Sequence, residues 1–523
     1  MINNQPDQKS AVRNPKLLLA VFFSGLTTLA VELSAFRLFA PTFGTANLVS
    51  AVVIGLILLY LAAGYTIGGR WADRSPRAET LYRIMLWGAF LVGLIPFIAQ
   101  PLLRIARDNL QDLTNFNAAL LILAFVVTLI LFSIPVTLLG CVSPFAIRLS
   151  ITDINKAGRV AGRLYAISTA GSFIGSFLPE LILLDLIGTR GTFVLLALIL
   201  IAIGAIGLGR KSIGFVWMPI VLIALNVLIP VSISEIAGTI YQTESAYNYI
   251  QVVQRGDTRF LLLNEGQGIH SIYNPNSIQS NGTWDYFTLA PFFNPAPYSP
   301  AGLKRLAIVG LAAGTIARSY TTIFGPFPID GIEIDPKIVQ VGQKYFDMNE
   351  SNLNIIVADG RAALANSPYH YNVVAIDAFR VPYIPWHLTT REYFLDVRDH
   401  LTSDGVLAMN VGHTPNNYDL VDAIARTAQG VFPSVYVVDV TGSFNSVVFA
   451  TMQPTSFDNL RANFDAMPHP LIQSTARLAL QNEHTVAASG VVFTDDKAPT
   501  EQMTNALVLN YLFGLSSGEI KLP

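Results

Sequence analysis

The chain has 523 residues, of which 52% are hydrophobic and only 13% are charged. Soluble globular proteins carry about 25% charged residues, so this composition excludes an ordinary soluble enzyme. The formal net charge of −2 combines two unlike halves: residues 1–240 carry 17 Lys and Arg against 10 Asp and Glu (17 − 10 = +7), and residues 241–523 carry 16 against 25 (16 − 25 = −9). The sequence therefore predicts a basic, apolar region followed by an acidic domain.

Residues 1–240 contain seven apolar runs that approach or reach the length needed to cross a membrane, which is about 20 residues with few charges. The runs are Leu17–Ala40, Leu48–Gly68, Leu81–Gln100, Ala118–Gly140, Leu164–Ile187, Thr192–Gly209 and Phe215–Ile233. No signal-peptide cleavage pattern precedes the first run and the series continues, so we expect this run to be retained as a helix. The series predicts a multi-pass transmembrane domain of about seven α-helices in the lipid bilayer, with a tight helical hairpin at Gly188–Gly191.

Lys and Arg are distributed unequally between the loops on the two sides of this predicted bundle. One side carries Lys9, Arg13, Lys16, Arg70, Arg74, Arg77, Arg83, Arg148, Lys156, Arg159, Arg163, Arg210 and Lys211, and the other carries Arg104, Arg107 and Arg190. Because Lys and Arg are retained in cytoplasmic loops, we expect a plasma (inner) membrane protein with a cytoplasmic N-terminus. Seven spans would then place the C-terminal domain outside the cytoplasm. A re-entrant run would return it to the cytoplasm, but the loop charges favour the outside placement.

Four ionisable residues lie within the apolar runs, namely Glu32, Arg37, Glu180 and Asp185. Charged groups inside a membrane are costly and are often functional. The alternative is that they pair with one another or with neighbouring helices, or lie near helix ends within reach of water. We favour this second interpretation because no repeated half with broken helices indicates a transport path.

Small residues in the same region favour close helix packing. Gly64 and Gly68, and likewise Gly171 and Gly175, are spaced four residues apart, which lets helix backbones approach each other. The single cysteine, Cys141, cannot form an intrachain disulfide, and we expect it to pack. Since no Cys/His cluster has zinc spacing, we expect no metal site.

From Tyr247 onward, short alternating segments replace the long apolar runs. The segments Tyr247–Gln254, Arg259–Leu263 and Ile269–Tyr273 are separated by turns. They predict a small antiparallel β-meander domain over residues 241–300.

After Pro300, apolar strands alternate with helical segments, which is typical of a parallel sheet covered by helices on both faces. The expected strands are Arg305–Gly310, Ile329–Glu333, Leu353–Ala358, Asn372–Asp377, Gly405–Asn410, Ser434–Val440 and Ser446–Ala450. Residues 301–523 are therefore predicted to form an α/β Rossmann-like domain that binds a nucleoside.

Glycines and acids follow four of these strands, at the edge where such sheets bind ligands. They are Gly310 and Gly314, Glu333 and Asp335, Asp359 and Gly360, and Asp377. The glycine turn would let a ligand approach backbone N–H donors at a helix start, and an acid about 20 residues further on can accept hydrogen bonds from ribose hydroxyls. A single acid of this kind is more often a helix cap, but four in order favour a nucleoside site.

These motifs resemble the spermidine synthase family of aminopropyltransferases, whose fold is of the S-adenosylmethionine-dependent methyltransferase type. The matching residues are Glu333-Ile334-Asp335-Pro336, Asp359-Gly360-Arg361, and Asp377 followed by Leu388-Thr389-Thr390 and Phe394. The segment Glu244–Ile250 is similar to the family's entry strand, and the resemblance covers roughly Tyr241–Ala450. With its hydrophobic first half and Thr494–Pro499, the chain resembles membrane-fused spermidine synthase-like proteins.

The resemblance implies a membrane-anchored transferase of polyamine biosynthesis that moves an aminopropyl group from decarboxylated S-adenosylmethionine to a small-molecule amine, without a metal. It implies Asp377 as the catalytic base, because the attacking amine must lose a proton near the sulfonium. It implies that the donor is bound by Asn248, Gly310, Gly314, Glu333, Asp335, Asp359 and Gly360. The implied acceptor site comprises Tyr247, Gln267, His270, Tyr286, Arg380, Asp495 and Asp496. A homodimer through the meander domain is also expected.

The chain departs from the family at two positions near the expected acceptor. Ala313 replaces the aspartate of the glycine loop, and Arg380 replaces an aspartate that anchors the diamine. A guanidinium group would repel a polycation, so we expect an acceptor other than a plain diamine. Arg380 would instead neutralise a substrate carboxylate or pair with Asp495 or Asp496.

Two further functions fit the sequence. One is a methyltransferase that uses intact S-adenosylmethionine, whose carboxylate Arg380 would accept. The other is a non-catalytic sensor or transport regulator that binds a nucleoside or polyamine. The acidic second half would repel phosphate, which argues against a nucleic-acid partner.

Overall fold

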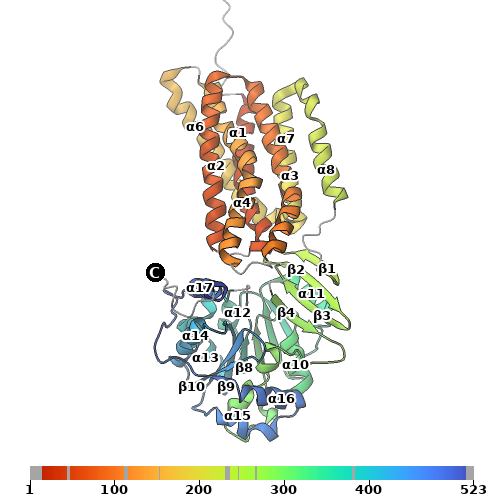
Figure 1. Cartoon of the computed structure of the whole chain (residues 1–523), viewed down its shortest axis with the longest axis vertical. Coiled ribbons are helices and arrows are strands. Elements are labelled where there is room, and N and C mark those ends of the chain that lie inside the picture. The colour runs from red at the N-terminus through yellow and green to blue at the C-terminus, as the bar shows by residue number, and fades with distance from the viewer. Residues whose placement is uncertain are drawn as a thin grey trace, which may run out of the picture. The chain divides into compact units, whose positions relative to one another are not determined.

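The computed structural model describes residues 14–43, 47–110, 116–151, 153–229, 236–245, 247–264, 268–379 and 383–513. The chain divides into two compact units, Met1–Glu235 and Ile236–Pro523. Figure 1 shows the helices of the first unit and the strands and helices of the second.

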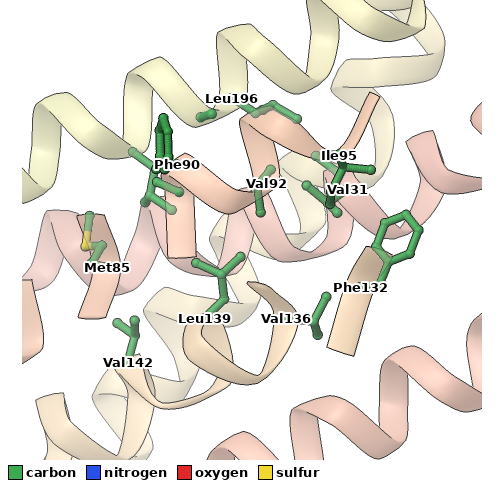
Figure 2. Packing of buried hydrophobic residues seen from close by; sticks show 14 of the residues in the cluster. Val31, Met85, Phe90, Val92, Ile95, Phe132, Val136, Leu139, Val142 and Leu196 are labelled. Carbon is green, nitrogen blue, oxygen red and sulfur yellow. The ribbon is translucent and has the colours of Figure 1, made fainter. Parts of the chain in front are cut away.

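The first unit is helical, as its long apolar runs predict. Its helices are α1 (Pro15–Phe43), α2 (Asn47–Arg74), α3 (Ala78–Leu110), α4 (Phe116–Gly140), α5 (Val142–Ser150), α6 (Ala157–Leu178), α7 (Leu184–Leu208) and α8 (Trp217–Leu228). Figure 2 shows how α1, α3, α4 and α7 contribute Val31, Phe90, Phe132 and Leu196 to one buried apolar cluster.

Six helical segments in the described part of this unit are long and apolar enough to cross a membrane, by length and composition. The seventh predicted run gives a shorter α-helix, α8, of 12 residues. A 3₁₀-helical turn, Gly209–Phe215, precedes it. The hairpin predicted at Gly188–Gly191 coincides with a break in α7, where Gly188 has φ 68° and ψ 175°.

Contacts with α3 define the path of the chain from Lys211 into α8. Lys211 forms an ion pair with Glu79, in the first turn of α3. Trp217, where α8 begins, contacts Phe90 with ring centroids 4.9 Å apart. The segment therefore starts at the first turn of α3 and continues along that helix.

The end of α8 is held by Arg190. Its Nη2 donates to the carbonyl oxygens of Leu225 and Ile229 at 2.8 and 2.7 Å and to that of Asn226 at 3.3 Å, so one guanidinium binds the carbonyls at this helix end. The same guanidinium lies 4.6 Å from the ring centre of Phe97 in α3. At 1.5 Å per residue, the step from Glu79 to Phe97 along α3 is about 27 Å, so Lys211–Ile229 covers nearly the ~30 Å of a bilayer core.

Two of the ionisable residues within the apolar runs, Arg37 and Glu180, pair with each other. Arg37 of α1 donates to Glu180 through Nη2 at 2.8 Å and Nε at 3.3 Å. Glu180 lies in a π-helical turn, Pro179–Leu183, directly after α6. The pair thus links two neighbouring helices.

Glycines allow very close helix contacts here, as their spacing predicts. A Cβ on Gly171 or Gly175 of α6 would lie 2.0 or 2.2 Å from a backbone oxygen of α1. A Cβ on Gly64 or Gly68 of α2 would lie 2.4 Å from the Thr137 oxygen or 2.6 Å from the Cα of Cys141. Cys141 is buried, which agrees with a packing role.

Replacing Gly171 with Ala is expected to destabilise this unit, because the new methyl group would collide with the backbone oxygen of Phe22. Overpacking of this kind costs about 1–3 kcal/mol. Gly162 of the same helix is the matched control, since its Cβ would have no heavy atom within 4 Å. Thermal unfolding in detergent should give a lower midpoint for Gly171→Ala than for Gly162→Ala, and equal midpoints would contradict this packing.

The second unit begins with a four-stranded antiparallel sheet in the order β1-β2-β3-β4. The strands are β1 (Thr239–Glu244), β2 (Tyr249–Arg255), β3 (Thr258–Leu263) and β4 (Gly268–Tyr273). The last three correspond to the predicted segments. Strand β1 was not predicted, because its side chains are half-buried or exposed and lack a clear apolar alternation.

An eight-stranded sheet follows, in the order β12-β10-β11-β9-β8-β5-β6-β7. Its strands are β5 (Leu306–Val309), β6 (Ile329–Glu333), β7 (Leu353–Val357), β8 (Tyr371–Ile376), β9 (Leu401–Gly412), β10 (Ser434–Asp439), β11 (Asn445–Thr451) and β12 (Glu483–His484). The predicted parallel pairing is correct for β5–β9 and wrong for the others, which pair antiparallel. The short β10–β11 connection explains this difference, because neighbouring strands joined by a tight turn must run in opposite directions.

Helices cover both faces of this sheet. They are α9 (Thr283–Phe287), α10 (Thr315–Phe324), α11 (Pro336–Tyr345), α12 (Gly360–Ala365), α13 (Arg391–Asp399), α14 (Asp419–Gln429), α15 (Asp458–Ala462), α16 (Pro470–Ala479) and α17 (Thr500–Phe513). Ile308 of β5 belongs to the core that includes α9, α10 and α16, whereas the next residue, Val309, belongs to the core that includes α13 and α14. Because β5–β9 pair in parallel, their carboxyl ends meet at one edge of the sheet.

Candidate active site

Asp377 directly follows β8 at this edge, and two side chains donate to its carboxylate. Trp284 of α9 donates through Nε1 at 2.8 Å, and Asn410 of β9 donates through Nδ2 at 2.9 Å. The indole N–H can only donate, so Asp377 is held as an acceptor. Burial raises the pKa of Asp377 above its ordinary value, and these two hydrogen bonds act in the opposite direction.

The amide of Asn410 also carries an acceptor that no described group satisfies. Its Oδ1 is buried without a hydrogen-bond partner in the described part of the chain. A buried unpaired acceptor costs free energy, and this one belongs to the amide that binds Asp377. Neither Asn410 nor Trp284 is among the predicted site residues, although the place of Asn410 near the end of β9 could have indicated it.

The glycine turn between β5 and α10 passes against Asp377. Gly310 has φ +89°, and a Cβ there would lie 2.5 Å from the carbonyl oxygen of Asp377. Gly314 has φ +88°, and a Cβ there would lie 2.7 Å from Cγ of Met348. Both positions require glycine because of their backbone conformation and their close neighbours.

The backbone N–H groups of this turn are engaged by the protein itself. Ala312 donates to Oε2 of Glu333, and Ala313 donates to Oγ of Ser271, each at 2.9 Å. Gly310, Leu311 and Gly314 donate to backbone carbonyls. The turn thus fixes Glu333 and β4, and the role of Gly310 and Gly314 in binding a ligand stays a prediction.

Glu333 ends β6 and is almost completely buried. Its Oε2 accepts from Ala312 and its Oε1 accepts from the backbone N–H of Asp335 at 3.0 Å. Burial, and to a smaller extent the negative charge of Asp335, raise the pKa of Glu333 to about 7. This carboxyl group therefore changes protonation state near neutral pH.

Asp335 and Asn248 lie at the junction between the two sheets of this unit. Asp335 caps α11 by accepting from the N–H of Lys337 at 2.9 Å, and it also accepts from Oγ of Ser245 and from Nδ2 of Asn248. Oδ1 of Asn248 accepts from Asn264 at 3.3 Å. These contacts are structural, and the ligand-binding roles of both residues stay predictions.

Asp359 follows β7 and caps α12, with Oδ1 accepting from the N–H of Ala362 at 3.1 Å. Its Oδ2 lies 3.0 Å from Nε2 of His387, a residue that the sequence analysis did not single out. Gly360 fits closely against β5, because a Cβ there would lie 2.4 Å from Cγ1 of Val309.

The residues expected to bind the acceptor are found in different surroundings. Tyr286 is buried, and its hydroxyl exchanges hydrogen bonds with Thr441. His270 lies on β4 with a buried Nε2 that has no hydrogen-bond partner among the described residues, and burial lowers its pKa to about 4. Tyr247 is exposed. Gln267 and Arg380 lie outside the described residues.

The arginine that binds Asp495 in the described structure is Arg361. Arg361 holds both of its oxygens, at 2.8 and 2.9 Å, and Thr390 donates to it at 2.7 Å. Arg361 keeps the pKa of Asp495 below its usual value. Asp496 is exposed in the turn that follows. Asp495 is therefore tied to Arg361 of α12, the helix that follows β7.

Part of the domain that carries this site is similar to known proteins. Residues 300–454 match the spermine/spermidine synthase domain. The probable polyamine aminopropyl transferase of Bifidobacterium longum is 28% identical over 284 residues, which cover 50% of this chain and 61% of that protein. The polyamine aminopropyltransferase of Vibrio vulnificus is 29% identical over 256 residues, 47% of this chain and 82% of that one.

Two other similarities are more distant. The eEF1A lysine and N-terminal methyltransferase of Mus musculus is 26% identical over 160 residues, which cover 28% of this chain and 23% of that protein. The crystal structure of a probable spermidine synthase from Corynebacterium glutamicum matches with 17% identity and a TM-score of 0.38, over 49% of this chain and 100% of that one. The chain spans about three fifths of the Bifidobacterium relative.

Proposed function

We propose that the protein, whose C-terminal half contains a spermine/spermidine synthase domain, is a membrane-anchored aminopropyltransferase. It would transfer an aminopropyl group from decarboxylated S-adenosylmethionine to a small-molecule amine. The observation that carries this proposal is Asp377, a carboxylate enclosed at the carboxyl edge and held by two donors. The relatives named polyamine aminopropyltransferase support a transferase of this type.

The described residues offer suitable groups for the nucleoside part of this donor. Glu333 is a buried carboxyl group. In the hydrogen bonds described above, Oε2 accepts the backbone N–H of Ala312 and Oε1 accepts that of Asp335. Since an ionised carboxylate offers about four lone-pair sites, it retains capacity for ribose hydroxyls. Asp359 is half-buried and retains similar capacity for the exocyclic amine of adenine.

The donor supplies a sulfonium-activated carbon, whose bond to sulfur breaks as the bond to the acceptor nitrogen forms and the electron pair moves to sulfur. Asp377 takes the proton that the amine must lose. Its raised pKa makes it a better base than an exposed aspartate, and its enclosed charge attracts the cations that flank the reacting atoms. Oδ1 of Asn410 would accept an N–H from the acceptor, which pairs its buried oxygen.

A methyltransferase is the second candidate, because part of the chain is similar to a protein named as one. Donor preference separates the two functions. Purified full-length protein should release methylthioadenosine from decarboxylated S-adenosylmethionine only when an amine is added. Turnover of intact S-adenosylmethionine instead, or release that does not depend on an amine, would contradict aminopropyl transfer.

The same proposal includes the side of the membrane on which the domain lies. Loop charges favour a cytoplasmic N-terminus, and the path of Lys211–Ile229 along α3 supports a seventh crossing. The C-terminal domain would then be extracytoplasmic, and the donor and acceptor must reach it on that side.

Reporter fusions after Pro523 test this orientation. We expect alkaline phosphatase, which needs an oxidising compartment for its disulfides, to be active in this fusion, and a fluorescent protein that matures only in the cytoplasm to be dark. Fusions after Gly209, where the chain would lie on the cytoplasmic side, serve as the control with the reverse result. A C-terminal fusion active only in the cytoplasm would overturn the seven-span topology.

A further inference from the structure

The carboxylate of Asp359 is fixed by the protein through both of its oxygens. Oδ1 accepts from the N–H of Ala362 at 3.1 Å, and Oδ2 lies 3.0 Å from Nε2 of His387. Because an ionised carboxylate can only accept, Nε2 carries the proton in this contact. The side chain of Asp359 keeps 40% of its surface exposed, so its remaining lone pairs are open to a ligand.

His387 is itself held in place by a charged network. Its carbonyl oxygen accepts from Nη1 of Arg361 at 3.3 Å. Arg361 is fixed in turn by two hydrogen bonds to Asp495 and one to Asp396, the latter at 3.2 Å. His387 also lies on the segment between Asp377 and α13, so it joins the turn after β7 to the segment that begins at the proposed base.

We infer that His387 is a positioning residue that makes the donor site selective for the nucleobase. It holds Asp359 with its free lone pairs directed outward, so that they accept from an exocyclic amine and disfavour a base that presents a carbonyl there. Without His387, Asp359 would keep only its cap to α12, and its other oxygen could rotate. The inference rests on the proposed function, since it assigns a role at the same donor site.

Binding of two nucleosides that differ only at this position tests the inference. Methylthioadenosine carries an exocyclic amine and methylthioinosine carries a carbonyl, and titration calorimetry on the full-length protein gives both dissociation constants. We expect His387→Ala to reduce the preference for methylthioadenosine by about fivefold to tenfold, the scale of one hydrogen bond. His387→Gln retains a donor and should restore most of the preference. His370→Ala, at an exposed histidine of the same domain, should leave it unchanged.

Other outcomes are equally decisive. If His387→Ala weakens both nucleosides equally, the residue has only a structural role and the inference is wrong. If it strengthens methylthioadenosine binding, His387 competes with the base rather than positioning its acceptor. If thermal melting shows that His387→Ala is misfolded, His387→Gln decides between the outcomes. The inference then requires His387→Gln to keep most of the wild-type preference for methylthioadenosine, and loss of that preference overturns it. Failure of the wild-type protein to bind either nucleoside would refute the proposed function itself.

Discussion

The Asp377→Asn variant is expected to lose about 10²–10⁴-fold in kcat, the usual contribution of a positioned general base. The amide cannot take a proton from the amine, and its NH₂ group would face one of the two donors, Trp284 or Asn410. Binding of methylthioadenosine should change little, because the nucleoside contacts are assigned to Glu333 and Asp359. Steady-state release of methylthioadenosine and calorimetric binding measure the two effects separately.

A matched control for this variant is Asp399→Asn. Asp399 is exposed, and the described structure pairs it with its neighbour Arg398, so its loss should leave kcat unchanged. Thermal melting of both variants checks that the fold is retained. If Asp377→Asn keeps the turnover of the wild-type protein, Asp377 is not the base. If the wild-type protein binds methylthioadenosine but shows no turnover with any amine, a sensing role replaces catalysis.

Binding of methylthioadenosine should strengthen by about tenfold between pH 6 and pH 8, because a group with a pKa near 7 goes from about one tenth to nine tenths ionised over this range. The group is Glu333, whose pKa burial raises to about 7. Its ionised form accepts hydrogen bonds from ribose hydroxyls, so affinity rises with pH. Glu333→Gln should abolish this dependence and weaken binding at pH 8 by about 10- to 100-fold, the scale of a charged hydrogen bond.

The same carboxyl group makes the unliganded protein less stable as pH rises, whereas it makes nucleoside binding stronger. Its folded pKa lies above the unfolded value, so its favourable contribution to the free energy of unfolding is complete below about pH 4.5 and is lost as pH rises through about 7.

Glu350→Gln is the control for the pH dependence of methylthioadenosine binding, because burial also raises the pKa of Glu350, which we assign no part in the donor site. If Glu350→Gln but not Glu333→Gln removes the pH dependence of binding, the assignment of the ribose ligand is wrong.

The acids of the site show how far the sequence could define it. Glu333, Asp335, Asp359 and Asp377 all follow strands, and their order predicted one sheet edge. The sequence could not separate caps from open carboxylates. Asp335 and Asp359 cap helices, whereas the two oxygens of Asp377 accept from side chains. That difference depends on the backbone geometry at each strand end.

The partners of these acids could not be predicted, because they come from distant parts of the chain. Trp284 is separated from Asp377 by 93 residues, and His387 is separated from Asp359 by 28. Only the packing of α9 on the sheet and the return of the segment before α13 bring them together. A tryptophan near a helix start otherwise predicts only an apolar contact.

The helical unit was predicted more completely, since hydropathy alone locates long apolar helices. The path of the seventh run was not evident from hydropathy. It depends on Arg190, which the sequence presented only as a loop charge and which the structure places on the final carbonyls of α8. A guanidinium that closes a helix end depends on three-dimensional proximity, which a hydropathy profile does not contain.

The central claim is that this protein adds an aminopropyl group to an amine with Asp377 as the base. The most direct measurement is the mass of the product formed from an isotopically labelled amine, with the wild-type protein and with Asp377→Asn. With the wild-type protein, the labelled amine is expected to gain one aminopropyl group per methylthioadenosine released, and Asp377→Asn is expected to form almost no product. A product that gains a methyl group, or equal product from both proteins, would contradict this claim.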